Sequence, residues 1–330
     1  MKAFGTILIT GGGGFLGSHL AENFLKNGHK VICIDNFCTG FKKNKSFLES
    51  ISGASQNLFF LEQDCVEDWG AWMHKIPQSF LVDVTHVFHF ASPASPPLYQ
   101  KLNIETMWVN TIGLKNAVEF ADAKGARVIF ASTSEIYGNP LVSPQPESYW
   151  GNVNTVGPRS CYDEAKRFGE SLLYTYNWRN KTKHGMVRIF NTYGPRMNPQ
   201  DGRVVINFLV QALQSKPLTV YGDGQQTRSF CYVDDLIKGI ITYASLDETE
   251  PVNIGNEQEF TILEAAQTVQ SLFPNKNLPI EHHSLPVDDP MLRRPDLQKA
   301  KRLLHGWEPK VELQEGLKKM IQWLQDENIQ

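Results

Sequence analysis

The chain has 330 residues, of which 41% are hydrophobic and 20% charged, and its formal net charge is −3. This length is enough for one large or two modest domains with a buried core. So small a net charge gives no reason to expect a nucleic acid or a membrane surface as a partner. The five cysteines form no closely spaced pair. We therefore expect no metal site and a reducing compartment.

The first apolar run, residues 6–10, lies so close to Met1 that we expect no signal peptide before it. No apolar run approaches the roughly 20 residues that a membrane-spanning helix needs. We therefore expect a cytoplasmic protein.

Short apolar runs alternate with amphipathic stretches through the first half of the chain. The expected strands are residues 7–9, 30–34, 58–61, 86–89, 127–131 and 186–189. The expected helices are residues 17–27, 106–124 and 162–179. This alternation predicts an α/β protein with a doubly wound parallel Rossmann sheet, whose ligands lie at the carboxyl ends of the strands.

The second half is less regular, with turns rich in glycine and proline and with expected helices at residues 261–272 and 313–326. We therefore expect residues 1–190 to form a dinucleotide-binding domain, to which residues 228–258 return. Residues 191–330 are expected to form a smaller C-terminal substrate-binding domain.

The loop after the first expected strand has its glycines at a spacing typical of dinucleotide sites. Gly11, Gly14 and Gly17 form the pattern GxxGxxG between a strand and a helix. Glycines let backbone N–H groups approach a pyrophosphate, and the N-terminus of the helix favours its negative charge. Glycine triplets also occur in plain flexible turns. The position between strand and helix is what favours a cofactor site here.

Asp35 ends the second expected strand and follows Gly17 by about the interval at which an acidic residue contacts the ribose of a dinucleotide. A carboxylate there repels a 2′-phosphate, so we expect NAD rather than NADP. The alternative for Asp35 is an ordinary acidic turn residue. Four further cofactor contacts are expected at Phe15, Leu16, Asn36 and Ala91, and Asp64 is expected near the adenine.

Tyr162 and Lys166 form a YxxxK motif on an expected helix, where residues four apart share one face. A nearby ammonium and the cationic nicotinamide of the cofactor favour the phenolate and should lower the pKa of the tyrosine from about 10. Tyr162 can then take a proton from a sugar hydroxyl while hydride passes to NAD. Thr133 or Ser134 can hydrogen-bond that hydroxyl, and Glu135 adds a carboxylate beside it. YxxxK alone is more often a helix surface, so this second cluster is what favours a catalytic site.

Together the glycine loop and the YxxxK pair resemble the extended short-chain dehydrogenases. Longer strings that span nearly the whole chain resemble one group among them, the UDP-glucuronate decarboxylases. These strings are FASPASPP at 90–97, ASTSEIYG at 131–138, PQPESYWG at 144–151, GPRSCYDE at 157–164, RIFNTYGPRM at 188–197, DGRVV at 201–205 and QTRSF at 226–230. The resemblance implies that UDP-glucuronate is converted to UDP-xylose. It also implies a homodimer joined through the helices at 106–124 and 162–179.

The resemblance also implies roles for single residues. It makes Thr133 the residue that holds the reacting hydroxyl, Glu135 the catalytic glutamate, and Tyr162 with Lys166 the general base pair. The implied substrate contacts, besides Glu135, are Tyr99 and Arg159 in the sugar pocket, Arg228 reaching into it, Asn191 and Arg293 at the diphosphate, and Tyr221 at the uridine. Glu105 departs from the pattern, because the family usually has a lysine after Tyr99 and an Asn-Pro pair.

In the implied reaction, Tyr162 takes the proton of the hydroxyl on sugar carbon 4 as hydride moves to NAD. The ketone formed lies beta to the carboxylate on carbon 5, so carbon dioxide can leave as an enolate forms. The enolate is then protonated and the hydride returns, which leaves the cofactor oxidised.

Three alternatives remain. A dTDP-glucose 4,6-dehydratase shares the first step but needs an acid for its leaving hydroxyl, typically an aspartate before the glutamate, where this chain has Ser134. A UDP-sugar 4-epimerase has no need of Glu135. A noncatalytic NAD-binding protein is disfavoured because Tyr162 and Lys166 are both present.

Overall fold

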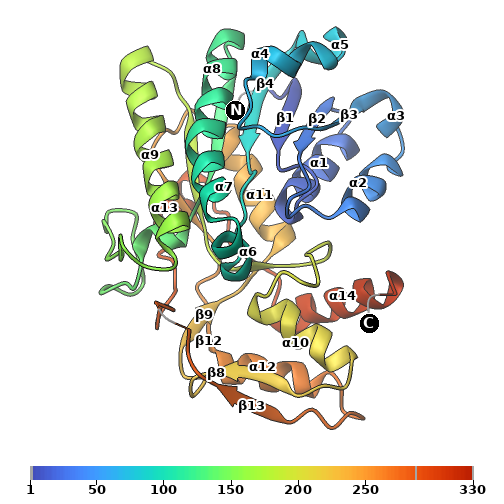
Figure 1. Cartoon of the computed structure of the whole chain (residues 1–330), viewed down its shortest axis with the longest axis vertical. Helices are drawn as coiled ribbons and strands as arrows, with labels where there is room; N and C mark the ends of the chain where they lie inside the picture. Colours follow the sequence, from blue (N-terminus) through green and yellow to red (C-terminus); the bar gives the residue numbers. More distant parts are fainter. Residues whose placement is uncertain (1–2, 287, 329–330) are drawn as a thin grey trace.

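The computed structural model describes residues 3–286 and 288–328. A seven-stranded sheet occupies the upper part of the molecule in Figure 1, with the strand order β11-β6-β5-β4-β1-β2-β3. Every neighbouring pair in it is parallel, which confirms the expected doubly wound sheet. Its strands are β1 (Thr6–Thr10), β2 (Val31–Asp35), β3 (Leu58–Glu62), β4 (Val84–His89), β5 (Arg127–Thr133), β6 (Gly185–Ile189) and β11 (Val252–Ile254).

Side chains of the sheet face two separate hydrophobic cores. Ile7 and Ile9 of β1 pack into the core that contains α1 (Phe15–Lys26) and α11 (Val233–Ala244). Leu8, between them, packs into the core that contains α8 (Leu114–Lys124). Successive side chains of a strand point to opposite faces, so a sheet covered on both faces needs apolar residues at every position. This explains why the strands appear in the sequence as continuous apolar runs.

The expected helix 106–124 is interrupted. It consists of α7 (Asn103–Trp108), a turn of π-helix at Val109–Gly113, and α8. The carbonyl of Val109 accepts a hydrogen bond of 2.9 Å from Nε2 of the buried His89. A π-helical turn is a local widening that leaves backbone groups for such partners. Beside these helices lies α9 (Ser160–Asn180).

Several short helical segments connect the strands. They are α2 (Lys42–Glu49), α3 (Ala54–Asn57), α4 (Trp69–Trp72), α5 (Gln78–Leu81), α6 (Pro96–Lys101), and 3₁₀ turns at Met73–Lys75 and Ser134–Tyr137. Over residues 3–286 and 288–328, no helix is both long and apolar enough to cross a lipid bilayer.

A smaller group of elements lies below the sheet in Figure 1. It contains the strand pairs β8 (Leu218–Tyr221) with β13 (Ile280–His283) and β9 (Thr227–Ser229) with β12 (Glu259–Thr261), and the helices α10 (Val204–Leu213), α12 (Ile262–Ser271) and α14 (Leu313–Asp326). The short strands β7 (Thr192–Tyr193) and β10 (Cys231–Tyr232) pair with each other, and α13 (Gln298–Leu303) contacts β11 of the main sheet. The start of α12 is fixed by a capping box between Thr261 and Glu264.

The order of the strands sets the position of the ligand site. After β1 the chain adds β2 and β3 on one side, and it then continues with β4 on the other side of β1. Ligands of such sheets bind at the carboxyl ends of the strands where this reversal occurs. A cavity of about 400 Å³ opens there, between the glycine loop and the smaller group of elements.

Candidate active site

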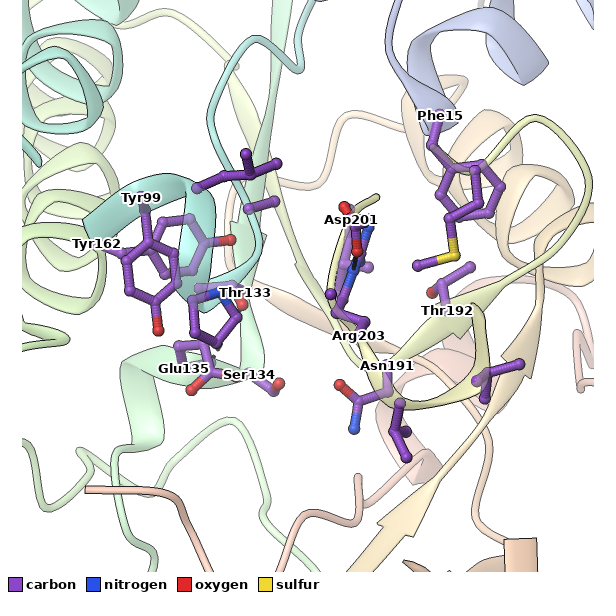
Figure 2. A pocket seen from close by; sticks show the side chains of 18 of the residues that line it. Phe15, Tyr99, Thr133, Ser134, Glu135, Tyr162, Asn191, Thr192, Asp201 and Arg203 are labelled. Carbon is purple, nitrogen blue, oxygen red and sulfur yellow. Dashed lines mark hydrogen bonds and ion pairs between the residues drawn. The ribbon is translucent and has the colours of Figure 1, made fainter. Parts of the chain in front are cut away.

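The cavity brings together most of the residues expected from the sequence. On the sheet side its lining includes the glycine loop with Phe15 and Leu16, and also Thr133, Glu135, Tyr162 and Lys166. Tyr99, Arg159, Asn191, Tyr221, Arg228 and Arg293 complete the predicted set. Figure 2 shows Tyr99, Tyr162, Thr133 and Glu135 on one side of this pocket, with Asn191, Asp201 and Arg203 across from them.

The glycine loop fits a backbone turn that excludes side chains. Gly11 has φ of +76°, and a Cβ atom added to it would lie 2.7 Å from the nitrogen of Ala91. A Cβ atom on Gly17 would collide with the carbonyl oxygen of Gly11. Helix α1 starts directly after Gly14, without a side chain that caps its first N–H groups. These N–H groups remain available to an anion at the edge of the cavity, which suits the pyrophosphate of a dinucleotide.

Asp35 and Ala91 contact this loop, and Asn36 and Asp64 pair with each other. None of these four is among the described residues that line the cavity. The buried Asp35 carboxylate accepts hydrogen bonds from the N–H groups of Gly13 at 2.9 Å and Phe37 at 2.7 Å. Burial raises the pKa of Asp35, and these backbone hydrogen bonds oppose the rise. Nδ2 of Asn36 donates to Asp64 at 3.0 Å. The N–H of Ala91 donates to Thr10 at 3.3 Å.

We predict that the protein binds NAD at least about tenfold more tightly than NADP, because a 2′-phosphate beside the Asp35 carboxylate would be repelled. Titration of the protein with each cofactor, followed by calorimetry, measures the two affinities. Asp35→Asn removes the negative charge and should reduce the difference between the affinities for NAD and NADP. Equal affinities in the unmodified protein would show that Asp35 does not face the ribose.

Helix α9 places Tyr162 and Lys166 on the same buried face. Nζ of Lys166 lies 5.6 Å from the centre of the Tyr162 ring and donates a 2.6 Å hydrogen bond to the carbonyl of Ala131. Burial lowers the pKa of Lys166 to about 7. Burial also raises the pKa of Tyr162, more than its hydrogen bond with Thr133 and the charge of Arg203 lower it. In the chain without its cofactor the pKa of Tyr162 is therefore raised, because desolvation of the phenolate dominates. The expected fall depends also on the cationic nicotinamide and stays a prediction for the protein with its cofactor bound.

Tyr99 packs directly on Tyr162. The two ring centres are 5.0 Å apart and the ring planes differ by 5°. The Tyr99 hydroxyl is buried and has no hydrogen-bond partner among the described residues. A hydroxyl left in this state at the wall of a cavity is suited to a bond with a bound ligand.

Three arginines and two carboxylates form a network across the cavity. Glu135 accepts hydrogen bonds from Arg159 at 2.5 Å and from Arg293 at 2.9 Å. Asp289 lies 3.6 Å from Arg159 and 2.9 Å from Arg228. Burial favours the neutral form of Glu135, but the charges of Arg293 and Arg159 outweigh it and hold the pKa of this carboxyl well below its usual range. The network has one more positive than negative group, which favours an anionic ligand.

The hydroxyl of Ser134 is part of this network, because it is bonded to Arg293. This hydroxyl accepts a 3.0 Å hydrogen bond from Nη1 of Arg293. From the motif alone either Thr133 or Ser134 can hold the reacting hydroxyl, and the family resemblance implies Thr133. Thr133 lies in hydrogen-bond contact with Tyr162, so the geometry favours Thr133.

No sequence pattern predicts a role for some of the residues that line the cavity. They include Asn44, Asp201, Arg203 and Asp289. Asp201 and Arg203 belong to the string at 201–205 that resembles the family, so the sequence contained a reason to expect them at the site. Asn44 belongs to no recognisable motif. Its amide nonetheless ties the glycine loop down, donating to the carbonyls of Gly13 at 3.1 Å and Arg196 at 3.2 Å. Glu105, where the family pattern has a lysine, is exposed on α7 and is not among the described residues that line the cavity.

Comparison with known proteins agrees with this geometry. Residues 7–255 match the NAD dependent epimerase/dehydratase family. UDP-glucuronic acid decarboxylase 1 of Danio rerio is 47% identical over 97% of this chain and 73% of its own length. UDP-glucuronic acid decarboxylase 5 of Arabidopsis thaliana is 47% identical over 94% of this chain and 86% of its own length.

Two solved structures share the fold along almost the whole chain. A UDP-glucose 4-epimerase from Thermotoga maritima, solved with UDP-glucose, gives a TM-score of 0.86 at 29% identity and covers 98% of this chain and 99% of its own. A UDP-glucuronic acid 4-epimerase from Bacillus cereus, in complex with UDP-glucuronic acid and NAD, gives a TM-score of 0.83 at 27% identity. The match covers 97% of this chain and 99% of the epimerase chain. The family match, the decarboxylase identities and the site geometry agree, and the chain belongs to the NAD dependent epimerase/dehydratase family and, within it, to the UDP-glucuronic acid decarboxylases.

Proposed function

We propose that this chain converts UDP-glucuronate to UDP-xylose and carbon dioxide, with NAD regenerated in every turnover. The observation that carries the proposal is the cavity itself, which combines the Tyr162–Lys166 pair with a carboxylate that two arginines keep ionised. The alternatives are a UDP-sugar 4-epimerase and a dTDP-glucose 4,6-dehydratase. Identity of 47% to the decarboxylases, against 29% and 27% to the epimerases named above, supports decarboxylation.

The glycine loop fits a dinucleotide, because its close backbone approach leaves N–H groups facing the cavity. NAD bound there would accept hydride from sugar carbon 4 and later return it. The residues that would hold it are Gly11, Gly14, Phe15, Leu16, Gly17, Asp35, Asn36, Asp64, Ala91, Tyr162 and Lys166.

The nucleotide sugar would lie across the arginine network. Arg228 and Arg293, with Asn191, would bind the diphosphate, since guanidinium groups match the geometry of phosphate oxygens. Tyr221, whose side chain is partly exposed at the cavity, would contact the uridine. Tyr99, Glu135 and Arg159 would surround the sugar.

Tyr162 would take the proton of the hydroxyl on carbon 4, which Thr133 holds by a hydrogen bond. The ketone at carbon 4 then accepts the electrons of the bond that releases carbon dioxide from carbon 5. Expulsion of a hydroxyl instead needs an acid. Glu135 is held ionised, and the Ser134 hydroxyl is a very weak acid already bonded to Arg293. The site therefore favours loss of carbon dioxide over dehydration.

We predict that the purified protein, supplied with UDP-glucuronate and NAD, forms UDP-xylose and carbon dioxide in equal amounts without net NADH. Chromatography of the nucleotide sugars and the absorbance of NADH measure both products. The same protein should leave dTDP-glucose unchanged. Rapid dehydration of dTDP-glucose, with UDP-glucuronate untouched, would replace the decarboxylase proposal by the dehydratase one. Formation of a 4-epimer of UDP-glucuronate would favour the epimerase.

We also propose a homodimer, formed through α7, α8 and α9. Large apolar side chains are exposed on these neighbouring segments, among them Trp108, Ile112, Phe168, Tyr174 and Trp178. Exposed apolar residues gathered on adjacent helices indicate a contact surface. A cytoplasmic location is part of the same proposal, supported by the free thiols of all five cysteines.

A further inference from the structure

The first four glycines of the glycine loop use their N–H groups to hold the turn itself. Those of Gly11 and Gly12 donate to one carbonyl of β2 at 2.7 and 3.3 Å. That of Gly13 donates to Asp35 at 2.9 Å, and that of Gly14 donates to the carbonyl of Gly11 at 3.0 Å. The next N–H groups along the chain are those in the first turn of α1, which no side chain of the described residues caps. A pyrophosphate at this loop would therefore be bound by the start of α1.

The side chain of Asn44 supports this turn from a neighbouring helix. Asn44 lies in the first turn of α2, is 1% exposed and lines the main cavity. Its Nδ2 atom donates to the carbonyl of Gly13 at 3.1 Å and lies 3.5 Å from the carbonyl of Gly14. The N–H of Phe41 donates to the same Gly13 carbonyl at 3.0 Å. The direction of the Gly13 carbonyl is therefore set by the chain at the start of α2.

The planarity of the peptide group carries this effect to α1. The C=O and N–H of a planar trans peptide point in opposite directions. The hydrogen bond from Asn44 to the carbonyl of Gly13 therefore also directs the N–H of Gly14 toward the carbonyl of Gly11. The carbonyl of Gly14 in turn accepts a hydrogen bond of 3.0 Å from the N–H of Ser18, in the first turn of α1. The orientation of Gly14 thus decides where the start of α1 presents its free N–H groups.

The same amide also holds a segment that leads into the smaller group of elements. Nδ2 of Asn44 donates to the carbonyl of Arg196 at 3.2 Å, and Arg196 also lines the main cavity. The guanidinium of Arg196 has contacts of its own with α1, because it donates to Ser18 at 3.2 Å and to Glu22 at 2.6 Å. Arg196 should therefore keep its position without Asn44, whereas the Gly13 carbonyl would lose one of its two hydrogen bonds.

We propose that Asn44 is a positioning residue for NAD, which fixes the glycine loop so that the first turn of α1 meets the pyrophosphate. A loop that is already held in its binding conformation loses less freedom when the ligand binds. Without the amide, the binding of NAD must also order the turn, which lowers the affinity for NAD. The arginine network lies on other elements, so the binding of UDP is independent of Asn44. This inference rests on the proposed position of NAD at the glycine loop.

The test is Asn44→Ala, which removes the amide and places a residue favourable to helices in α2. Calorimetric titration should show an affinity for NAD about 10-fold lower than that of the wild type, as expected for the loss of one or two hydrogen bonds. The affinity for UDP should equal that of the wild type. In turnover, the KM for NAD should rise by about the same factor and by more than kcat falls.

Asn253→Ala is the matched control. Asn253 is also a buried asparagine, and its amide joins separate segments by donating to the carbonyls of Gln145 at 2.9 Å and Asp296 at 3.3 Å. It is not among the described residues that line the main cavity. Both variants should unfold at lower urea concentrations than the wild type. Only Asn44→Ala should bind NAD more weakly.

Hydrogen exchange in the protein without NAD provides a second measurement. The amides of residues 11–14 should exchange faster in Asn44→Ala than in the wild type or in Asn253→Ala, because the turn opens more often. If Asn44→Ala does not fold, Asn44→Ser, which keeps a hydroxyl at this position, should show the same selective loss on a smaller scale. An unchanged affinity for NAD, or an equal loss of affinity for NAD and UDP, would overturn the proposal. A wild-type protein that binds no NAD would instead contradict the proposed function.

Discussion

Tyr162→Phe should lower the turnover of UDP-glucuronate by about 10²- to 10⁴-fold, the range expected when a general base is removed. Phenylalanine keeps the ring, and therefore the stacked contact with Tyr99. The change removes the hydroxyl and its hydrogen bond with Thr133. This loss should lower the free energy of unfolding by about 1 kcal/mol. The fold should survive, and so should the binding of both nucleotides, because the glycine loop and the arginines are untouched.

Formation of UDP-xylose measures the loss, and calorimetric titration with NAD and UDP-glucuronate measures the binding. Tyr174→Phe is the matched control, since it removes a hydroxyl from the same helix at a side chain that does not line the main cavity. The control should turn over at the wild-type rate. Near-normal turnover in Tyr162→Phe would remove Tyr162 from the mechanism.

The main sheet is largely predictable from the sequence, because its strands are buried on both faces. An apolar run between helical stretches marks each strand except β11, which has three residues. β11 is held by its parallel pairing with β6, and three residues give no periodicity to detect. The turn of π-helix at Val109–Gly113 was also missed, since it depends on a partner, His89, from another strand.

The residues of the cavity also divide into those that the sequence predicts and those that it does not. Gly11, Gly14, Gly17, Tyr162 and Lys166 are predictable, because their spacing along one loop or one helix face fixes their geometry. The pairing of Glu135 with Arg293 joins residues 158 positions apart, and no local pattern encodes which carboxylate that arginine meets. The spacing of residues along the chain also does not predict how deeply each side chain is buried. Burial raises the pKa of Tyr162 in the chain without its cofactor, and it leaves Oδ1 of Asp163 without a hydrogen-bond partner among the described residues.

Glu135→Gln should both destabilise the protein and impair the later steps of the reaction. Glutamine keeps the shape of the side chain but leaves Arg293, which is 1% exposed, without its carboxylate partner. Removing one member of a buried ion pair costs about 3–5 kcal/mol, because the remaining charge is buried and uncompensated. Arg159 is affected less, since Asp289 lies 3.6 Å away.

The pH dependence of this loss follows from the direction of the Glu135 pKa shift. The pKa in the folded protein lies below the unfolded value of about 4.3. Glu135 therefore contributes its full stabilisation above about pH 4.3, and the contribution is lost as the pH falls toward the folded pKa. The difference in unfolding free energy between wild type and variant should be full at neutral pH and should shrink below about pH 4.3. Urea unfolding on both sides of that value measures it.

Measurements of activity distinguish a chemical role of Glu135 in the reaction from its role in stabilising the fold. Glu170→Gln is the matched control, because Glu170 forms a similarly buried ion pair with Arg188 at 2.7 Å and does not line the main cavity. Both variants should lose stability, but only Glu135→Gln should slow the steps that follow oxidation, so that NADH persists during a single turnover. Because Glu135 can also orient the sugar, some loss in the oxidation step is expected as well. If the two variants lose stability equally and both return NADH to NAD at the wild-type rate, Glu135 acts only as the partner of its arginines.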